Sequence, residues 1–106
     1  MLRIHNTIIE LVRDVAPIAS DVARHDTDLA RQLRRALSSV ALNTAEGSDQ
    51  RGRRRASHYS IALGSAREAW SALLTATAWG YIDAPSNVLQ GKFDHVIGTL
   101  VRNVRR

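Results

Sequence analysis

The sequence contains no cysteine, and among its 15 basic residues only Lys92 is not an arginine. The absence of cysteine excludes a disulfide framework, thiolate zinc sites and a cysteine nucleophile. It also fits a reducing compartment, so we expect a cytoplasmic protein.

Long apolar runs are missing as well. The longest uncharged run, residues 69–82, contains several Ser and Thr and is shorter than the roughly 20 residues that a membrane-spanning helix requires. Charged residues interrupt the first part of the chain at Arg3, Glu10 and Arg13, so the sequence predicts no secretory signal peptide. We therefore expect no association with a membrane.

The sequence also lacks the motifs of catalytic sites. Its histidines, His5, His25, His58 and His95, do not have the spacing of metal ligands. Gly91 and Lys92 lack the upstream glycine of a phosphate-binding loop, and no nucleophile elbow or zinc-protease motif occurs. We therefore expect a non-enzymatic protein without a metal or a cofactor.

The 106 residues, 44% hydrophobic and 24% charged, have the composition of a single globular domain spanning residues 1–106. Apolar residues recur with helical spacing, and the short links between long helices favour an all-α, antiparallel up-down-up-down four-helix bundle. The expected helices cover residues 4–24, 28–46 and 56–80, followed by a last helix after Ser86. Segment 48–55 is either a loop or the first turn of the third helix.

Periodic apolar rows define the core that we expect. They comprise Ile4, Ile8, Leu11, Val15, Ile18 and Val22 in the first helix, Leu29, Leu33, Leu37, Val40 and Thr44 in the second, Ala56, Tyr59, Leu63, Ala66, Trp70, Leu73 and Thr77 in the third, and Leu89, Phe93, Val96 or Ile97, Leu100 and Val104 in the last. Trp79 is likewise expected in the core or an interface.

Individual residues predict where the helices kink, begin and end. Pro17 should kink the first helix rather than break it, because the apolar row keeps its phase on both sides. Asp26 or Thr27 is expected to cap the second helix and Ser86 the last one. Gly47 is expected as the C-cap of the second helix, and Gly64 should mark a close approach of a neighbouring helix.

The formal net charge is +5, and it lies in the second half of the chain. Four arginines, Arg51, Arg53, Arg54 and Arg55, form its densest cluster, with Arg34, Arg35 and the C-terminal Arg102, Arg105 and Arg106 as further contributors. Arginine binds phosphate through a fixed charge and two parallel donors, so the cluster favours a nucleic-acid backbone as partner. The alternative is a loop whose charges only keep it solvated.

Three polar residues, Asn43, Glu46 and Glu68, lie next to apolar positions and need an explanation. Asn43 and Glu46 share one face of the second helix, where we expect them to be partly buried. They indicate a hydrogen-bond network or a Glu46–Arg bridge rather than a metal cluster, because no Glu is followed three residues later by a histidine.

The stretch 32–47, QLRRALSSVALNTAEG, resembles the signature of the four-helix-bundle proteins encoded in intervening sequences of bacterial 23S rRNA genes. Tyr59, the segment 62–68 (ALGSARE) and the turn Gly80-Tyr81-Ile82 are similar to further blocks of that family. Residues that match its motif positions are Arg34, Arg35, Asn43, Glu46, Gly47, Gly64, Ser65 and Glu68, most of which the resemblance implies to be structural.

The resemblance implies a homopentamer and kinship with the accessory protein of diversity-generating retroelements, which is thought to bind nucleic acid and a reverse transcriptase. Together with the charge, it predicts a self-associating bundle that binds RNA or DNA through Arg51, Arg53, Arg54 and Arg55, with help from Arg34 and Arg35. A protein-interaction module with merely solubilising arginines is the rival hypothesis. A metal-dependent enzyme on a bundle scaffold is the third.

Overall fold

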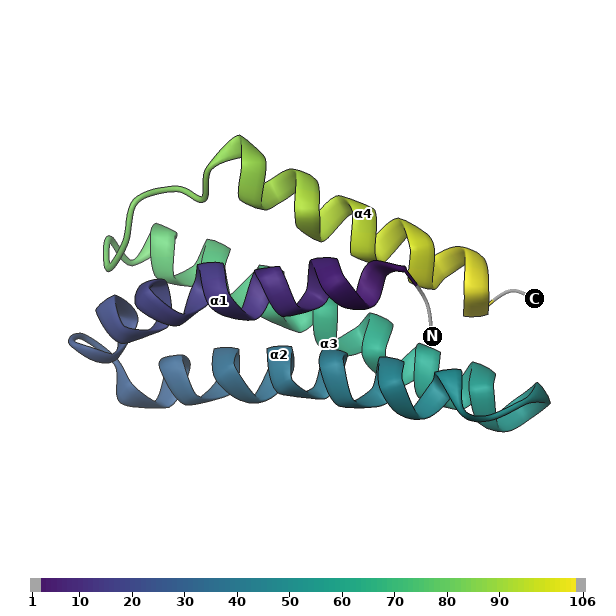
Figure 1. The fold of residues 1–106 in the computed structure, drawn as a ribbon. Coiled ribbons are helices and arrows are strands. Elements are labelled where there is room, and N and C mark those ends of the chain that lie inside the picture. Colours follow the sequence, from purple (N-terminus) through teal and green to yellow (C-terminus); the bar gives the residue numbers. More distant parts are fainter. Residues whose placement is uncertain (1–2, 105–106) are drawn as a thin grey trace.

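The computed structural model describes residues 3–104, and every regular element in that range is a helix. The four helices are α1 (Ile4–Ala23), α2 (Thr27–Ser48), α3 (Gly52–Ala78) and α4 (Asn87–Val104) (Figure 1). Neighbouring pairs pack around a common core: α1 with α2, α2 with α3, α3 with α4, and α4 with α1. The prediction of an all-α chain with four helices is confirmed. Arg105 and Arg106 lie outside the described residues.

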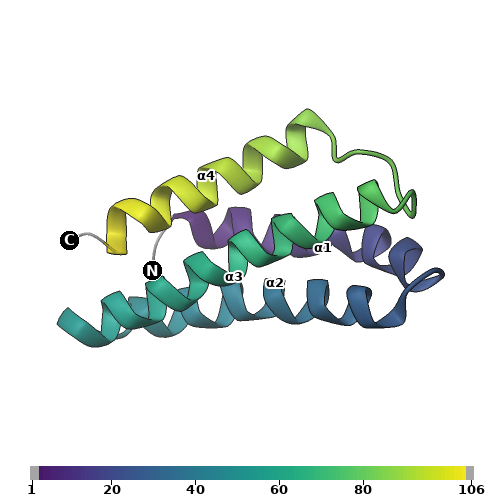
Figure 2. The same cartoon turned by 180° about the vertical axis from the view of Figure 1, so that it is seen from behind.

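The two ends of the elongated molecule carry different segments. Both termini and the α2–α3 link lie at one end, and the α1–α2 turn and the α3–α4 link lie at the other (Figures 1 and 2). We call the first the arginine end, because it holds Arg3, residues 51–55 and Arg102. The second, which holds His25, Trp79 and Tyr81, is called the aromatic end.

Side-chain caps fix two of the helix starts where the sequence predicts them. The Asp26 carboxylate accepts a hydrogen bond from the Leu29 amide at 2.9 Å and caps α2, and Ser86 Oγ accepts one from the Leu89 amide at 3.1 Å and caps α4. Gly80 ends α3 in the left-handed region, with φ +80°, and the Tyr81 amide then donates to the Ala76 carbonyl at 2.9 Å. The predicted end of the third helix near Gly80 is confirmed.

The rows predicted for the first, second and last helices form most of the core, whereas the row predicted for the third helix is only partly right. The members of that row that are buried are Tyr59, Ala66 and Leu73, and those that are half-buried are Ala56, Leu63, Trp70 and Thr77. The other buried positions of α3 are Ala62, Ala69, Ala72 and Ala76.

In α1 the row is buried from Ile4 to Val22 with one exception, Ile18, which is half-buried. α1 continues through Pro17 without a break. A main apolar cluster fills most of the bundle, and a small one built from Val22, Ala30 and Ala76 lies toward the aromatic end. Packing is therefore thinner at the aromatic end than along the rest of the bundle.

Two expectations about glycines are wrong. Gly47 does not end α2, which continues to Ser48 with Asp49 as its C-cap; it is a buried interior residue facing the Tyr59 ring. Gly64 is exposed in the interior of α3, and a Cβ built on it would meet nothing within 4 Å, so no helix among residues 3–104 approaches it closely. The close approach predicted for Gly64 occurs instead at Gly47.

Within residues 3–104 no helix is both long enough and apolar enough to cross a membrane.

Candidate nucleic-acid interface

The arginine cluster begins α3. Arg51 is the N-cap of the helix in extended conformation, and Gly52 follows with φ +60°, a left-handed conformation that glycine adopts easily. Arg53, Arg54 and Arg55 form the first turn and are exposed. Of the two alternatives for segment 48–55, the first turn of the third helix holds from Gly52 onward.

Arg55 differs from the other arginines of this cluster. Its Nε donates to the Gln50 carbonyl at 2.9 Å and to the Gly47 carbonyl at 3.3 Å. The Gly47 carbonyl also accepts from the Gln50 amide at 3.2 Å, and Gln50 follows the C-cap of α2, so Arg55 adds a side-chain donor to the backbone where α2 ends. Arg55 thereby connects the end of α2 to the start of α3.

The next turn of α3 packs closely against the end of α2, and we call this contact between the end of α2 and the start of α3 the corner. Tyr59 is only 2% exposed, and its ring lies so close to Gly47 that a Cβ there would be 2.4 Å from a ring carbon. The Tyr59 hydroxyl also lies 3.4 Å from Ser48 Oγ. Gly47 is therefore required for close packing of α2 against α3.

A polar network continues along the same helix pair. Asn43 Nδ2 donates to the Ser39 carbonyl at 3.0 Å and to Ser39 Oγ at 3.1 Å, and Ser65 Oγ donates to Ser39 Oγ at 2.7 Å. Asn43 Oδ1 lies 3.0 Å from His58 Nδ1; since this oxygen can only accept, the ring nitrogen donates. The predicted hydrogen-bond network exists, with Asn43 and Ser65 as members.

The two glutamates of the motif do not join it. Glu46 and Glu68 are both exposed, so the expected partial burial of Glu46 is wrong, and no ion pair with an arginine forms at either residue in the described range. Both carboxylates lie on outward faces of their helices, where water solvates them. Among residues 3–104 no three His, Asp or Glu side chains gather in a way that would hold a metal ion.

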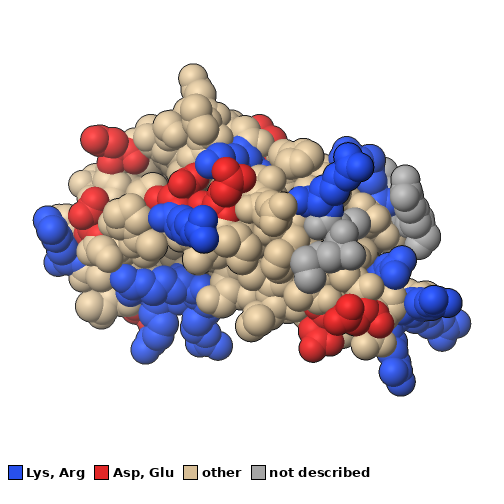
Figure 3. Space-filling view, in the orientation of Figure 1, with Lys and Arg blue, Asp and Glu red and all other residues tan. Residues whose placement is uncertain are grey.

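Positive charge is concentrated at the arginine end. Arg3 precedes α1 and Arg102 lies in the last turn of α4, so both join the α3 arginines there, opposed by Glu46 and Asp49. Figure 3 shows blue side chains at this end and a second group of blue side chains toward the aromatic end. The N-terminus of α3 carries a partial positive charge of its own, so its arginines add to that field instead of neutralising it. Such a surface favours anions.

Arg34 and Arg35 do not belong to this surface. They precede the end of α2 at Ser48 by more than three turns, which is about 20 Å along the helix. Arg34 lines an apolar groove between α1 and α2, whereas Arg35 lines a polar groove with Ser65 and Glu68. In a single chain they therefore form a second basic region, on two other faces, and their expected help in binding nucleic acid stays a prediction.

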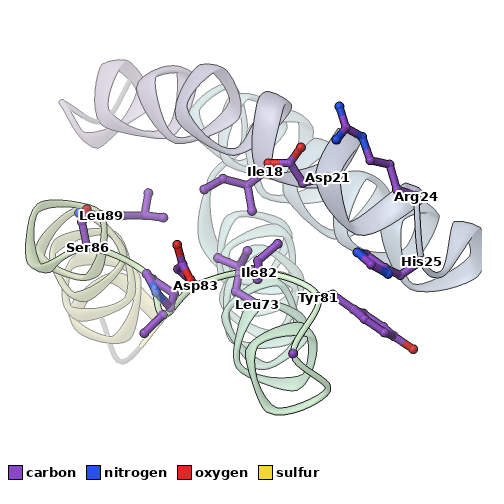
Figure 4. A pocket seen from close by; sticks show the side chains of 13 residues that line it. Ile18, Asp21, Arg24, His25, Leu73, Tyr81, Ile82, Asp83, Ser86 and Leu89 are labelled. Carbon is purple, nitrogen blue, oxygen red and sulfur yellow. Dashed lines mark hydrogen bonds between the residues drawn. The ribbon is translucent and has the colours of Figure 1, made fainter.

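The aromatic end is built differently. A hollow of about 700 Å³ opens between the last turn of α1, the α3–α4 link and the start of α4 (Figure 4). Ile18, Leu73 and Leu89 give it apolar walls, and Asp21 and Asp83 place carboxylates at its rim. Arg24 and His25 also line it, so this end combines apolar walls with polar and charged groups of both signs.

Flat rings flank this hollow. His25 stacks on Tyr81 at a centroid distance of 4.9 Å, and Tyr81 lies nearly parallel to Trp79 at 6.3 Å. Trp79 is 69% exposed, so it does not belong to the core of this chain, and the alternative of an interface position stays a prediction. It occupies the C-cap of α3, where the helix ends beyond the core. Trp70 is half-buried and packs against Phe93 at 5.1 Å.

Sequence reasoning missed the special role of Arg55 and the hollow at the aromatic end. Arg55 stands four residues before Tyr59 and seven before Ala62, both of which face the core. That spacing places Arg55 on the inward face of α3, a signal that the sequence does contain. The hollow has no such signal, because it depends on the path of the α3–α4 link.

Comparisons with known proteins give one match. Neither the curated proteins nor the solved structures contain a match to this chain. A family model, that of the 23S rRNA-intervening sequence protein, matches residues 1–102, which is nearly the whole chain. The protein therefore belongs to the 23S rRNA-intervening sequence protein family.

Proposed function

We propose that this protein is a non-enzymatic, cytoplasmic, antiparallel four-helix bundle that self-associates and binds the backbone of RNA or DNA through its arginine end. The contacts are made by Arg51, Arg53 and Arg54, with Arg3 and Arg102 beside them. Arg34 and Arg35 supply a second basic region that a bound nucleic acid reaches only by extending along the bundle or across subunits.

One observation carries this proposal: exposed arginines are grouped at a helix N-terminus that is itself positive. This arrangement costs electrostatic free energy in the free protein, and a bound polyanion offsets it. Guanidinium groups match phosphate oxygens with two parallel donors. Each neutralised phosphate also releases counterions, which gives affinity without sequence specificity.

Exposed apolar residues support self-association. Leu42 is 67% exposed, Ile61 49% and Leu74 47%, and all three lie on the helix pair α2 and α3. In the assembly that we propose, these side chains are covered by neighbouring subunits. In a homopentamer the charge of the arginine end is repeated on every subunit, so weak single contacts combine into stronger binding.

The experiment is a titration of labelled RNA and DNA at several salt concentrations. Binding should weaken with salt, with a log–log slope of about −0.7 per phosphate for a single strand and about −0.9 for a duplex. The variant R51A/R53A/R54A should flatten the slope by about 2 to 3. The control R13A/R24A/R67A removes the same charge from exposed positions elsewhere and should change the slope less.

No binding to any nucleic acid at about 50 mM salt would contradict the proposal, since phosphate contacts are strongest there. Circular dichroism of both variants checks that the helices remain. Light scattering tests the assembly separately, because a monomer at all concentrations would contradict self-association while leaving the binding result intact.

The rival function is a protein-interaction module, and the exposed apolar residues on α2 and α3 favour it as much as they favour self-association. Its partner would be another protein, for example a reverse transcriptase if kinship with the retroelement accessory protein holds. Under this hypothesis the arginine variant and its control lose nucleic-acid binding equally.

A further inference from the structure

We propose that the arginine end binds the phosphates of a paired, double-stranded nucleic acid in preference to a single strand. This inference rests on the function proposed above and names the class of nucleic acid. Its basis is the separation of two kinds of side chain. The arginines that bind phosphate and the accessible aromatic rings that stack on bases lie at opposite ends of the bundle.

The positions of all five aromatic residues are known. Tyr59 is near the arginines but 2% exposed, with its ring packed on Gly47. Trp70 and Phe93 pack against each other inside the bundle. Trp79 and Tyr81 are accessible to solvent, but both lie at the aromatic end. No Phe, Tyr or Trp ring is therefore available to a base bound at the arginine end.

The distance between the two groups is large. α3 connects them with 27 residues, from Gly52 to Ala78, which corresponds to about 40 Å. The longest extent of the molecule is 42 Å. A strand whose phosphates lie on Arg53 and Arg54 thus meets neither Trp79 nor Tyr81 with the same nucleotides.

Proteins that bind single strands combine a basic groove with aromatic rings, and each stacked base raises the affinity by about tenfold or more. The arginine end offers no such ring for base stacking. A flexible single strand that binds there therefore loses conformational entropy, and no stacking energy offsets that loss. A duplex already has ordered phosphates, with about one charge per 1.7 Å of helix axis. Phosphate contacts alone are sufficient to bind it.

The geometry of the corner fits an ordered partner. Arg55 binds the carbonyls at the end of α2, and Tyr59 packs on Gly47, so the first turns of α3 are held firmly against α2. Arg53 and Arg54 consequently project from a fixed base. Fixed cations match the fixed phosphates of a duplex better than those of a strand that must first be ordered.

The test compares four labelled ligands: an RNA duplex and a DNA duplex of about 16 base pairs, and an unpaired strand of each kind without internal pairing. Fluorescence anisotropy measures the dissociation constants of the full chain at several salt concentrations. We expect at least one duplex to bind about tenfold more tightly than its own unpaired strand, the equivalent of one missing stacking contact. The RNA and DNA arms identify which duplex is the better ligand.

The variants R51A/R53A/R54A and W79A separate the two ends. We expect the arginine variant to lose its affinity for the duplex. W79A should bind all four ligands with the same dissociation constants as the unchanged protein. Single strands that bind as tightly as both duplexes, with a retained salt slope, would overturn this inference and leave the proposed function standing. Absence of salt-dependent binding to all four ligands would overturn both.

Discussion

The arginine end and the aromatic end of the bundle differ in charge, packing and shape. At the arginine end, α2 and α3 meet in a tight corner that Arg55 and Tyr59 hold together. At the aromatic end, the longer link between Ala78 and Asn87 leaves a hollow of about 700 Å³. A bundle of regular helices thus has one closely packed end and one end with an open hollow.

The charges follow the same division. At the aromatic end Arg31 pairs with Asp28 within α2, and hydrogen bonds from Arg31 and Gln32 hold the pKa of the Asp28 carboxyl below its usual value. No such pairing occurs for Arg53 or Arg54 in the described part of the chain. The comparison shows that Arg31 has a local partner, whereas Arg53 and Arg54 present guanidinium groups without an ion pair among the described residues.

The largest expected effect contrasts one aromatic residue from each end. Tyr59→Ala removes a ring that is 2% exposed and should lower the free energy of unfolding by about 3 kcal/mol or more. Trp79→Ala removes a ring that is 69% exposed and should change it by less than about 0.5 kcal/mol in the monomer. Urea unfolding measures both, and equal losses would contradict the difference in packing.

Two glycine substitutions test the close packing of α2 against α3. In Gly47→Ala the new Cβ meets the Tyr59 ring, so overpacking of about 1–3 kcal/mol should exceed the helix-propensity gain of about 1 kcal/mol. In Gly64→Ala the Cβ meets nothing within 4 Å, so only the gain remains. Thermal unfolding should place the Gly64 variant above the unchanged protein and the Gly47 variant below it. The reverse order would refute the close packing of α2 on α3.

Substitutions of Arg55 and Arg54 distinguish a structural role in the α2–α3 contact from a role in phosphate binding. Arg55→Ala should lower the free energy of unfolding by about 1 kcal/mol, because the Gln50 carbonyl loses its donor and the Gly47 carbonyl keeps only the Gln50 amide. Arg54→Ala should leave stability nearly unchanged and reduce the salt slope on a duplex by about 0.9. If Arg55→Ala changes the slope as much as Arg54→Ala does, Arg55 binds phosphate directly.

The smallest effect concerns Lys92, which joins α4 to α1 midway between the two ends. Its Nζ donates a hydrogen bond to Asp14 at 2.7 Å and lies 3.7 Å from a Glu10 oxygen. These carboxylates raise the pKa of Lys92 above its usual value, and the hydrogen bond to Asp14 is the largest cause. A pKa raised by folding stabilises the protein below the pKa of the unfolded chain, and this contribution disappears as pH rises through the folded value. Stability should therefore fall above about pH 10.4, the usual lysine value.

Lys92 is the only lysine, so its Cε resonance can be followed without overlap. Its NMR titration midpoint should lie above that of free lysine, and in Asp14→Asn it should move back toward the free value. A midpoint at or below the free value would show that the ion pair does not form in solution.

Much of the fold is predictable from the sequence, because the information is local. Apolar spacing indicates four helices, Asp26 and Ser86 precede them with capping side chains, and Gly80 marks the end of α3. These features depend on residues within a few positions of one another, so no knowledge of the tertiary structure is needed.

The candidate site is less predictable, because its properties arise from contacts between helices. Gly47 resembles a C-cap in the sequence and becomes a packing position only because Tyr59 covers it. Arg55 has the same side chain as Arg53 and Arg54, yet only Arg55 donates to the Gly47 and Gln50 carbonyls where α2 ends. Sequence spacing could not show that Arg34 and the α3 arginines lie on separate surfaces either, since the chain turns between them.

The most direct test of the central claim, that nucleic acid binds at the arginine end, is an NMR titration of the labelled protein with a short duplex. We expect the Nε–H resonances of Arg53 and Arg54 and the amide of Gly52 to shift first and saturate together. The indole resonance of Trp79, at the other end of α3, should stay in place. A shift of the Trp79 indole with unchanged arginine signals would contradict the account.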